Sequence, residues 1–410
     1  MTRILAFLFL LLPAVTVTAQ GYDDVVFEEN SQRRQASMDD SWAARAGQKL
    51  DEMIRNSKML KTSSVGIKVY DLTDNCEVYS HDAQQRHKPA STMKVITAVT
   101  AMDVFGPEHD FVTELRFDGH LTDGTLEGNL YCVGGMDPCF NSDDMSALVN
   151  ALKQRGISRV SGKICADMSF KDPVLLGEGW MWDDDNPQLS PLLVNKSSKF
   201  LPEFIKQLRQ GGITVDADTA TLTASYQARL LAHRIHSLDD VLNIMMKNSD
   251  NLYAEAVFYH LAKTVSHGAV SAKQAREAIR QLVERLGLSY EDYTFTDGSG
   301  LSHYNMVTAE LEVEYLKYAY RHKKIYEKLY KHMPIAGVDG TLKKRMQNGP
   351  AYANVVAKTG TIRGVSSLAG YFKAPNGHII CFSILNQGIV NASDGRAFQD
   401  RLLQMLCALE

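Results

Sequence analysis

The spacing of apolar residues predicts an amphipathic helix near the start of the folded part of the chain, followed by a hairpin. Apolar residues recur at helical spacing from Ser41 through Ile54. Polar and apolar residues then alternate over 65–72 and 76–80, with the turn residues Thr73-Asp74-Asn75 between them. We expect these two segments to be neighbouring strands of an antiparallel sheet.

The end of the chain continues the same pattern. Residues 352–361 are rich in β-formers up to a glycine, and 365–372 alternate like an antiparallel neighbour. Asn376-Gly377 is a strong two-residue turn signal before the apolar strand 379–385, and 397–409 has the spacing of a closing helix. The first and last segments thus supply strands and helices to one antiparallel sheet.

Two helices with a short turn between them are predicted after residue 237. Ser237-Leu238-Asp239-Asp240 is typical of a capping box, and the apolar-periodic segment that it starts ends near Lys247-Asn248. A second helix follows over 252–262. Ser249-Asp250-Asn251 therefore lies in the turn, where side chains can point into a cleft, although this triplet is also common in ordinary turns and caps.

Composition limits size, partners and cofactors. With 410 residues, 45% of them apolar, and a net charge of −4, the chain can form about two or three domains and has no charge excess for binding nucleic acid. Six cysteines are few for this length; Cys132 and Cys139 could form a bridge, whereas Cys381 is expected to be a buried apolar residue. The sequence lacks histidines at metal-ligand spacing, so we expect no metal and no other cofactor.

The first residues are predicted to be a signal peptide. Arg3 precedes an apolar core at 4–12, and Val17-Thr18-Ala19 is a small-residue cleavage site, which assigns 1–19 to the signal peptide. Residues 20–40 are polar, without an apolar period, and are expected to be a flexible lead-in. The mature protein is therefore expected in the periplasm, with at most peripheral membrane contact, because no later apolar run reaches the length of a spanning helix.

Ser91-Thr92-Met93-Lys94 supplies a candidate nucleophile and its base. At positions i and i+3 of a helix that begins near Ser91, the hydroxyl and the amine lie on one face, and the helix N-terminus favours a developing oxyanion. Lys94 can act as a base only when it is neutral, and burial beside a second cation, for which Lys358 is the candidate, would lower its pKa. The alternative is a helix-capping serine followed by a surface lysine.

Ser249 and Asn251 add groups that acyl transfer through a serine ester needs. The Ser249 hydroxyl can relay a proton between the nucleophile or Lys94 and a leaving amine. The Asn251 amide can hold a substrate carbonyl, and Asp250 would brace the turn.

The third motif, Lys358-Thr359-Gly360, lies near the end of the predicted strand at 352–361. Lys358 and Thr359 would offer charge and a hydroxyl to a substrate carboxylate, and Gly360 would let a substrate backbone approach. The backbone N–H of Thr361, together with that of Ser91, could form an oxyanion hole. Alone, Lys358-Thr359-Gly360 is equally compatible with a solvated strand end.

The long separation of Ser91 from Ser249 predicts an inserted region of about domain size between them. That region contains a predicted helix at 143–154, a strand at 160–167 and a helix at 199–209. The expected division is a discontinuous catalytic domain, formed by 41–105 and 237–410, and an inserted region, 106–236.

In this order the three motifs resemble the signature of penicillin-binding proteins and serine β-lactamases. Four other stretches, at 128–138, 179–184, 296–302 and 336–342, are similar to the D-alanyl-D-alanine carboxypeptidase/endopeptidase family of class C low-molecular-mass penicillin-binding proteins. The likeness extends from about Ser41 to the C-terminus. It implies an α+β fold of the serine β-lactamase/penicillin-binding transpeptidase type, with an antiparallel sheet flanked by helices, a helical lobe and an inserted α/β region.

The resemblance also implies a substrate. Ser91 would attack the penultimate carbonyl of a peptidoglycan stem peptide ending in D-Ala-D-Ala and expel D-alanine, and family members often cleave existing crosslinks as well. β-Lactam antibiotics would be covalent inhibitors with slow release, because the chain lacks the Glu-x-x-Leu-Asn segment that activates water in class A β-lactamases.

Asp137 is a further candidate for substrate binding. It matches the family position whose carboxylate can pair with the free amine of a diamino-acid stem residue; the alternative is a turn-capping aspartate. Met136 stands where the family usually has glycine, a departure at the tip of the same loop.

Other functions stay open at this point. A β-lactamase or esterase on the same scaffold would turn over nitrocefin or esters rapidly with little stem cleavage; the inserted region and the missing glutamate argue against it. A noncatalytic peptidoglycan-binding protein would keep the groove without forming an acyl-enzyme; the intact Ser91 and Lys94 argue against that. An interaction protein is a more distant alternative.

Overall fold

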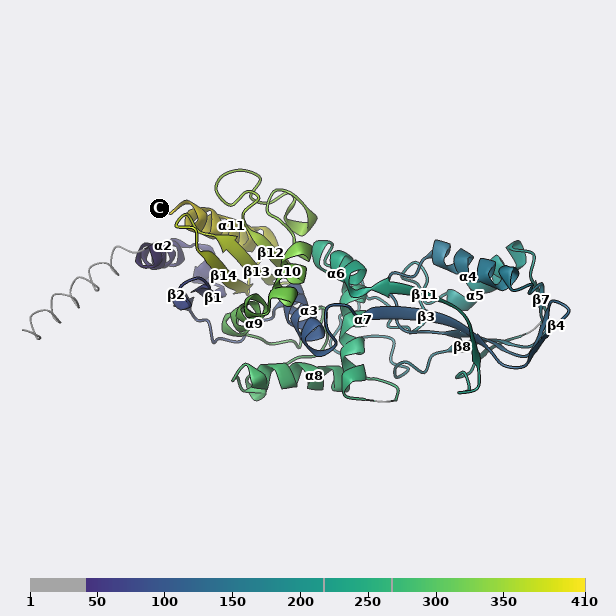
Figure 1. Cartoon of the computed structure of the whole chain (residues 1–410). Coiled ribbons are helices and arrows are strands. Elements are labelled where there is room, and N and C mark those ends of the chain that lie inside the picture. Colours follow the sequence, from purple (N-terminus) through teal and green to yellow (C-terminus); the bar gives the residue numbers. More distant parts are fainter. Residues whose placement is uncertain (1–41, 217, 267, 410) are drawn as a thin grey trace, which may run out of the picture.

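The computed structural model describes residues 42–216, 218–266 and 268–409. The predicted signal peptide (1–19), the predicted lead-in (20–40) and Ser41 lie outside the described residues. The rest is α+β, as expected: a sheet with helices on both faces, a helical lobe, and an elongated region with two further sheets (Figure 1). No helix among the described residues combines the length and the apolar character that crossing a membrane requires.

The first sheet combines strands from both ends of the chain, in the order β12-β13-β14-β1-β2, with all neighbours antiparallel. The predicted strands are confirmed, except that β12 begins at Val356 and not near Tyr352, because Ala353 adopts a left-handed conformation (φ 53°) in a turn before it. The strands are β1 (Ser64–Asp71), β2 (Cys76–His81), β12 (Val356–Ile362), β13 (Val365–Lys373) and β14 (Ile379–Gln387).

The two faces of this sheet belong to different cores. Ile67 and Val69 of β1 face the core that contains α2 (Trp42–Asn56) and α11 (Ala392–Ala408). Cys381 of β14 is buried, as predicted, in the opposite core, which is shared with the helical lobe. Alternation along the strands therefore covers both faces of the sheet with helices.

The helical lobe surrounds two helices, α3 and α7, that are buried on nearly every side, in agreement with their apolar residues all round. The predicted capping box is confirmed at the start of α6, where the Ser237 side chain accepts from the Asp240 N–H. The helices are α3 (Met93–Val104), α6 (Leu238–Lys247), α7 (Asn251–Leu261), α8 (Ala272–Arg285), α9 (Ala309–Arg321) and α10 (Lys323–His332).

Two further sheets take all their strands from residues 110–237. One has the order β10-β8-β6-β3-β11 and the other the order β4-β5-β7-β9. Their helices are α4 (Ser142–Gln154) and α5 (Phe200–Gln210), close to the predicted ranges. The strands are β3 (Asp110–Phe117), β4 (His120–Thr122), β5 (Thr125–Glu127), β6 (Leu130–Val133), β7 (Arg159–Val160), β8 (Ile164–Asp167), β9 (Thr214–Val215), β10 (Thr219–Thr221) and β11 (Arg229–Ser237).

One strand of this region differs from its prediction. The expected strand at 160–167 is two strands, β7 and β8, in different sheets. Between them Gly162 lies against the backbone of Gly128, so closely that a Cβ there would be 2.0 Å from the Gly128 carbonyl oxygen. The chain passes from one sheet to the other at this close approach of the two backbones. The domain boundaries expected from the sequence stay a prediction.

Buried contacts join the region 106–236 to the helical lobe. Phe111 and Met136 belong to the core of the lobe. His260 of α7 is hydrogen-bonded to His109 (2.8 Å) and to the Gly135 carbonyl (2.7 Å), and its burial beside His109 lowers its pKa to about 3. The inserted region is thereby attached to the helix that also begins with Asn251.

The bridge that the sequence allowed between Cys132 and Cys139 is not formed, because all six cysteines are free thiols. The two side chains pack in different cores. Cys132 on β6 lies in the core of the inserted region, whereas Cys139 packs against the core of the helical lobe.

Candidate active site

The candidate nucleophile lies in a strained turn just before α3. Residues Ala90–Thr92 form one turn of 3-10 helix, and the α-helix begins at Met93, two residues later than the predicted start near Ser91. Ala90 has a φ of 48°, a left-handed conformation that costs a non-glycine residue about 1 to 3 kcal/mol. Gly300 lies against this turn, where a Cβ would be only 1.7 Å from the Ala90 carbonyl oxygen.

Lys94 is fully buried one helical turn after Ser91. Its Nζ donates to Ser91 Oγ (2.9 Å), to Asn251 Oδ1 (2.8 Å) and to the Ser299 carbonyl (2.8 Å), so all three hydrogens of the ammonium have acceptors. Burial lowers the pKa of Lys94 to about 8, against the opposing effect of nearby carboxylates, of which Asp297 has the largest. The alternative of a surface lysine does not hold.

Ser249 and Asp250 lie in the turn between α6 and α7, as predicted, whereas Asn251 is the first residue of α7 and not part of the turn. Ser249 has a φ of 60°, and the Asp250 side chain caps α7 by accepting from the Tyr253 N–H. Because the Asn251 oxygen accepts from Lys94, its NH₂ group is the one that can donate to a substrate carbonyl. The turn and the start of α7 thus present a hydroxyl and an amide next to the Ser91–Lys94 pair.

Lys358 approaches the same place from β12. Its Nζ donates to Ser249 Oγ (2.8 Å) and to the Thr359 carbonyl (2.7 Å), and its side chain is fully buried. Burial, followed by the proximity of Lys94, lowers the pKa of Lys358 well below its usual value. Thr359 is partly exposed and donates to the Thr341 hydroxyl (2.7 Å). Two serine–lysine pairs therefore lie within one cluster.

Gly360 brings β12 into contact with the Ser91 turn. A Cβ at this position would be 2.0 Å from Ser367 Oγ, 2.7 Å from the Pro89 carbonyl oxygen and 2.9 Å from the Ser91 nitrogen. The glycine therefore allows close packing of strand and turn. Its predicted contact with a substrate backbone stays a prediction, as does the oxyanion hole with Thr361, which follows as an exposed residue of the strand.

A pocket of about 610 Å³ opens beside the Ser249 turn. Its other wall is a loop of the inserted region, and Lys196 on this loop forms an ion pair with Asp250 (2.7 Å). The lining residues are Asp185, Asn186, Pro187, Gln188, Lys196, Ser197, Ser198, Lys199, Asn248, Ser249, Asp250, Asn251 and Leu252. The inserted region thus lines a pocket beside Ser249 and Asn251, whereas Ser91, Lys94 and Lys358 do not line it.

Within the part of the chain that the structure describes, Asp137 forms no hydrogen bond or ion pair with the residues of the three motifs. Its buried carboxylate accepts from the Cys139 N–H (3.0 Å) and pairs with His236 (2.7 Å). This geometry matches the turn-capping alternative, and pairing with a substrate amine stays a prediction. Met136 adopts a φ of 52°, which explains why glycine would fit this position without strain.

Two buried carboxylates near Lys94, those of Asp297 and Glu255, were not predicted from the sequence. Asp297 accepts from Trp180 Nε1 (2.8 Å), the Ser302 N–H (2.7 Å) and Asn305 Nδ2 (2.7 Å). Glu255 accepts from the Ser299 N–H (2.8 Å), and burial raises its pKa to about 8. Glu255 stands four residues after Asn251 and hence on the same face of α7, which is the one sequence signal that could have found it.

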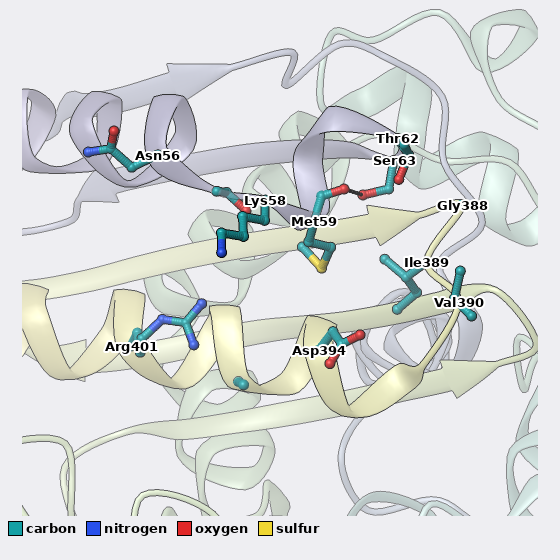
Figure 2. Close-up of a pocket in the computed structure, with 12 residues that line it drawn as sticks. Asn56, Lys58, Met59, Thr62, Ser63, Gly388, Ile389, Val390, Asp394 and Arg401 are labelled. Carbon is teal, nitrogen blue, oxygen red and sulfur yellow. Dashed lines mark hydrogen bonds between the residues drawn. The ribbon is translucent and has the colours of Figure 1, made fainter.

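Two other features, a cavity and a group of possible metal ligands, contain none of the motif residues. A cavity of about 570 Å³ lies between the 56–63 segment and α11, at the core on the other face of the sheet (Figure 2). Ligand atoms of Asp71, Asp74 and His378 lie within 4.8 Å of one another, but Asp71 already pairs with His378 (2.7 Å) and accepts from the Thr73 and Asp74 N–H groups.

A serine held by a buried lysine, a second serine–lysine pair, and an antiparallel sheet beside a helical lobe define the class of serine acyl-transfer enzymes of the penicillin-binding type. The model of the D-Ala-D-Ala carboxypeptidase 3 (S13) family matches residues 46–196 and 186–409. The chain therefore belongs to this family of serine-type carboxypeptidases, which confirms the resemblance inferred from the motifs.

Known relatives cover most of the chain. It is 26% identical to the D-alanyl-D-alanine carboxypeptidase DacB of Haemophilus influenzae over 79% of this chain and 85% of the relative. It is 26% identical to the D-alanyl-D-alanine carboxypeptidase of Actinomadura sp. strain R39, over 82% and 80% of the two chains.

Solved structures confirm the fold. The crystal structure of penicillin binding protein 4 from Haemophilus influenzae matches with a TM-score of 0.81 at 23% identity, covering 87% of this chain and 99% of that one. The same protein in complex with a β-lactam matches with a TM-score of 0.75 at 25% identity, covering 87% and 98%.

Proposed function

We propose that this chain is a serine-type D-Ala-D-Ala carboxypeptidase that also acts as a D,D-endopeptidase on peptidoglycan stem peptides, through an acyl-enzyme on Ser91. The observation that carries the proposal is the fully buried Lys94, whose Nζ lies 2.9 Å from Ser91 Oγ. A buried amine with a lowered pKa is a suitable base for a serine hydroxyl.

Acylation follows from the arrangement of the two serine–lysine pairs. Neutral Lys94 takes the Ser91 proton while Ser91 Oγ attacks the penultimate carbonyl, and the N–H groups of Ser91 and Thr361 stabilise the oxyanion. Ser249, hydrogen-bonded to Lys358, relays this proton from Lys94 to the departing amine, so the carbon–nitrogen bond breaks, D-alanine leaves and Lys94 is neutral again. Thr359 and Lys358 hold the terminal carboxylate, and Asn251 holds the acyl-side carbonyl.

Deacylation completes the cycle. Water attacks the ester carbonyl and gives a proton to neutral Lys94. Lys94 returns this proton to Ser91 Oγ as the ester bond breaks, which regenerates Ser91 and releases the shortened stem. With a β-lactam the same attack opens the ring. Since the sequence lacks the Glu-x-x-Leu-Asn segment, we expect this acyl-enzyme to persist, which disfavours the alternative of a β-lactamase.

The site of action follows from export. Residues 1–19 are proposed to be a cleaved signal peptide that directs the protein to the periplasm, where peptidoglycan is the substrate. The mature N-terminus, determined by mass spectrometry after periplasmic extraction, should begin near Gln20. Retention of the first residues in a cytoplasmic fraction would contradict this part of the proposal.

The inserted region, 106–236, is proposed to select the stem peptide, with Asp137 as the residue that pairs with the free amine of a diamino acid. In the structure the Asp137 carboxylate pairs with His236. The amine of the substrate would therefore have to displace His236 from this carboxylate. Asp137→Ala should then slow cleavage of amine-bearing stems more than cleavage of amine-lacking stems. Equal effects on both, or none, would contradict the pairing.

Activity on crosslinked muropeptides tests the proposed reaction. Wild-type protein should release D-alanine from pentapeptide stems and monomers from crosslinked dimers, and Ser91→Ala should do neither. Ser142→Ala, a change of an exposed serine on α4, serves as the matched control. Rapid nitrocefin turnover with intact stems would favour a β-lactamase, and binding of muropeptides without any product would favour a noncatalytic protein.

A further inference from the structure

A buried hydrogen-bond network joins Pro89 and Thr92, on either side of Ser91, to the sheet and to α9. The Pro89 carbonyl accepts from the hydroxyls of Thr92 (2.8 Å) and Ser367 (2.5 Å). Thr92 is the residue just before α3, where a threonine hydroxyl commonly caps the helix N–H groups, yet it makes no such cap. Its oxygen lies instead 2.5 Å from Oε1 of Glu312 on α9.

Glu312 links three parts of the catalytic domain. The side chain is completely buried, and its Oε2 accepts from the hydroxyl of Ser383 on β14 (2.7 Å). One carboxyl group thus connects α9, the central strand of the sheet and the turn that carries the nucleophile. A left-handed residue such as Ala90 persists only where surrounding contacts fix it, and this network supplies such contacts.

Charged and titratable groups on the elements around α9 have other partners. Lys68 on β1 pairs with Glu77 and Glu310, and Lys317 pairs with Glu314. Lys94 on α3 is committed to Ser91, Asn251 and Ser299, and Tyr371 on β13 donates to the Leu316 carbonyl. On α10, Lys328, Lys331 and His332 pair with Asp239, and Lys323 pairs with Glu327. Among the described residues no ion pair reaches Glu312, whose side-chain partners are the hydroxyls of Thr92 and Ser383. An ionised Glu312 would therefore be a buried charge without a cation, which is unfavourable by several kcal/mol.

The count of hydrogens leads to the same result. The Thr92 hydroxyl has one hydrogen but two oxygen neighbours, the Pro89 carbonyl and Glu312. The carbonyl can only accept, so the Thr92 hydrogen goes there. The short contact between Thr92 and Glu312 then needs a hydrogen from the carboxyl group.

We propose that Glu312 acts as a neutral carboxylic acid and is a positioning residue for Ser91. It donates to Thr92, Thr92 donates to the Pro89 carbonyl, and Ser383 donates to the second carboxyl oxygen, so each hydrogen has one acceptor. Loss of the carboxyl hydrogen would make Thr92 leave one of its two partners and loosen the turn. The inference rests on the proposed function, since it concerns the same serine.

The pH dependence of acylation is the readout that separates positioning from general stability. Burial raises the pKa of Glu312 to about 7, so the neutral form, and with it the rate per folded molecule, should decline at alkaline pH. In Glu312→Gln the amide NH₂ can donate to Thr92 and the amide oxygen can accept from Ser383. This variant should acylate within a few-fold of wild type at neutral pH and should lose the alkaline decline.

The experiment measures the second-order rate of acylation by penicillin from pH 6 to pH 10, together with kcat and KM for a stem pentapeptide. Glu312→Leu, which has no donor, should lower the acylation rate and kcat about 10- to 100-fold, with little change in KM. Glu314→Gln, the same chemical change two residues along α9, should behave like wild type. If Glu312→Leu does not fold, Thr92→Val removes the same link and should slow acylation, and Thr92→Ser should restore it.

The outcomes separate this inference from the proposed function. A wild-type protein that penicillin does not acylate at all overturns the proposed function. A wild-type protein that is acylated, with Glu312→Leu or Thr92→Val acylated at the same rate, overturns the positioning role alone. An alkaline decline of the acylation rate that is unchanged in Glu312→Gln would also overturn the positioning role.

Discussion

Two buried lysines, each in contact with a serine hydroxyl, are the central feature at the scale of single residues. Lys94 lies 2.9 Å from Ser91 and Lys358 lies 2.8 Å from Ser249. Burial disfavours the charged form of both amines and lowers both pKa values, that of Lys94 to about 8, so Lys94 can accept a proton near neutral pH. The pairs can therefore move a proton from the attacking oxygen to the leaving nitrogen.

The pKa of Lys94 predicts how acylation depends on pH. The folded pKa is lowered to about 8, so the base is mostly protonated below this pH and the rate should fall about tenfold for each pH unit toward acid. Lys94→Arg keeps a cation that cannot lose its proton, and should lower the rate at least about 100-fold at every pH. The measurement is the acylation rate of wild type and variant between pH 5 and pH 7, below the range in which deprotonation of Glu312 lowers the rate. A flat wild-type profile, or an active arginine variant, would contradict the role of Lys94 as base.

The motif residues could be predicted from the sequence, whereas the buried glutamates that hold the surrounding backbone in place could not. Ser91 and Lys94 are close because helical spacing places them on one face, which is a local property. Glu255 and Glu312 act through contacts with residues 44 and 220 positions away in the chain. Apart from the spacing of Glu255 from Asn251 on α7, nothing local distinguishes these glutamates from glutamates on a surface helix, so their roles become visible only in the fold.

At the scale of elements, the site depends on how closely β12 meets the Ser91 turn. Gly360→Ala would place a Cβ 2.9 Å from the Ser91 nitrogen and 2.7 Å from the Pro89 carbonyl oxygen, both backbone atoms that cannot move independently. The variant should lower the acylation rate about 10- to 100-fold, since displacements of about 1 Å have effects of that size. Gly268→Ala is the control, because a Cβ there meets no atom within 4 Å. Normal acylation of Gly360→Ala would show that this contact is not needed.

Element boundaries were predictable where capping signals are local. The capping box at Ser237 correctly places the start of α6, and alternation correctly places β1, β2, β13 and β14. The 3-10 turn at Ser91 was missed because a left-handed Ala90 has no sequence signal. The conformation of Ala90 is fixed by tertiary contacts of the turn. Gly300 packs against Ala90 itself, Glu312 contacts Thr92, and Ser367 donates to the Pro89 carbonyl.

At the scale of the whole molecule, the candidate site is assembled from segments that lie far apart in the sequence. The sheet supplies Lys358, the helical lobe supplies Lys94 and Asn251, and Lys196 of the inserted region pairs with Asp250 beside them. The sequence predicted the class of fold and the existence of an insertion. It could not predict that the insertion takes part in two further sheets, or that its Lys196 meets Asp250, because both depend on long-range pairing.

The state of the cysteines is a prediction for the whole molecule. All six are free, so denatured protein should titrate six thiols with a chromogenic reagent. Because Cys132 and Cys139 lie in different cores, reductant should change neither the melting temperature nor the activity of freshly purified protein. A titration of four thiols that rises to six after reduction would contradict this account.

The most direct test of the central claim is mass spectrometry of the intact protein after incubation with penicillin, followed by peptide mapping. We predict a mass increase of one penicillin on wild type, located on the peptide that contains Ser91, and no increase on Ser91→Ala. Labelling of another residue, or equal labelling of the Ser91→Ala variant, would contradict the assignment of Ser91 as the acylated nucleophile.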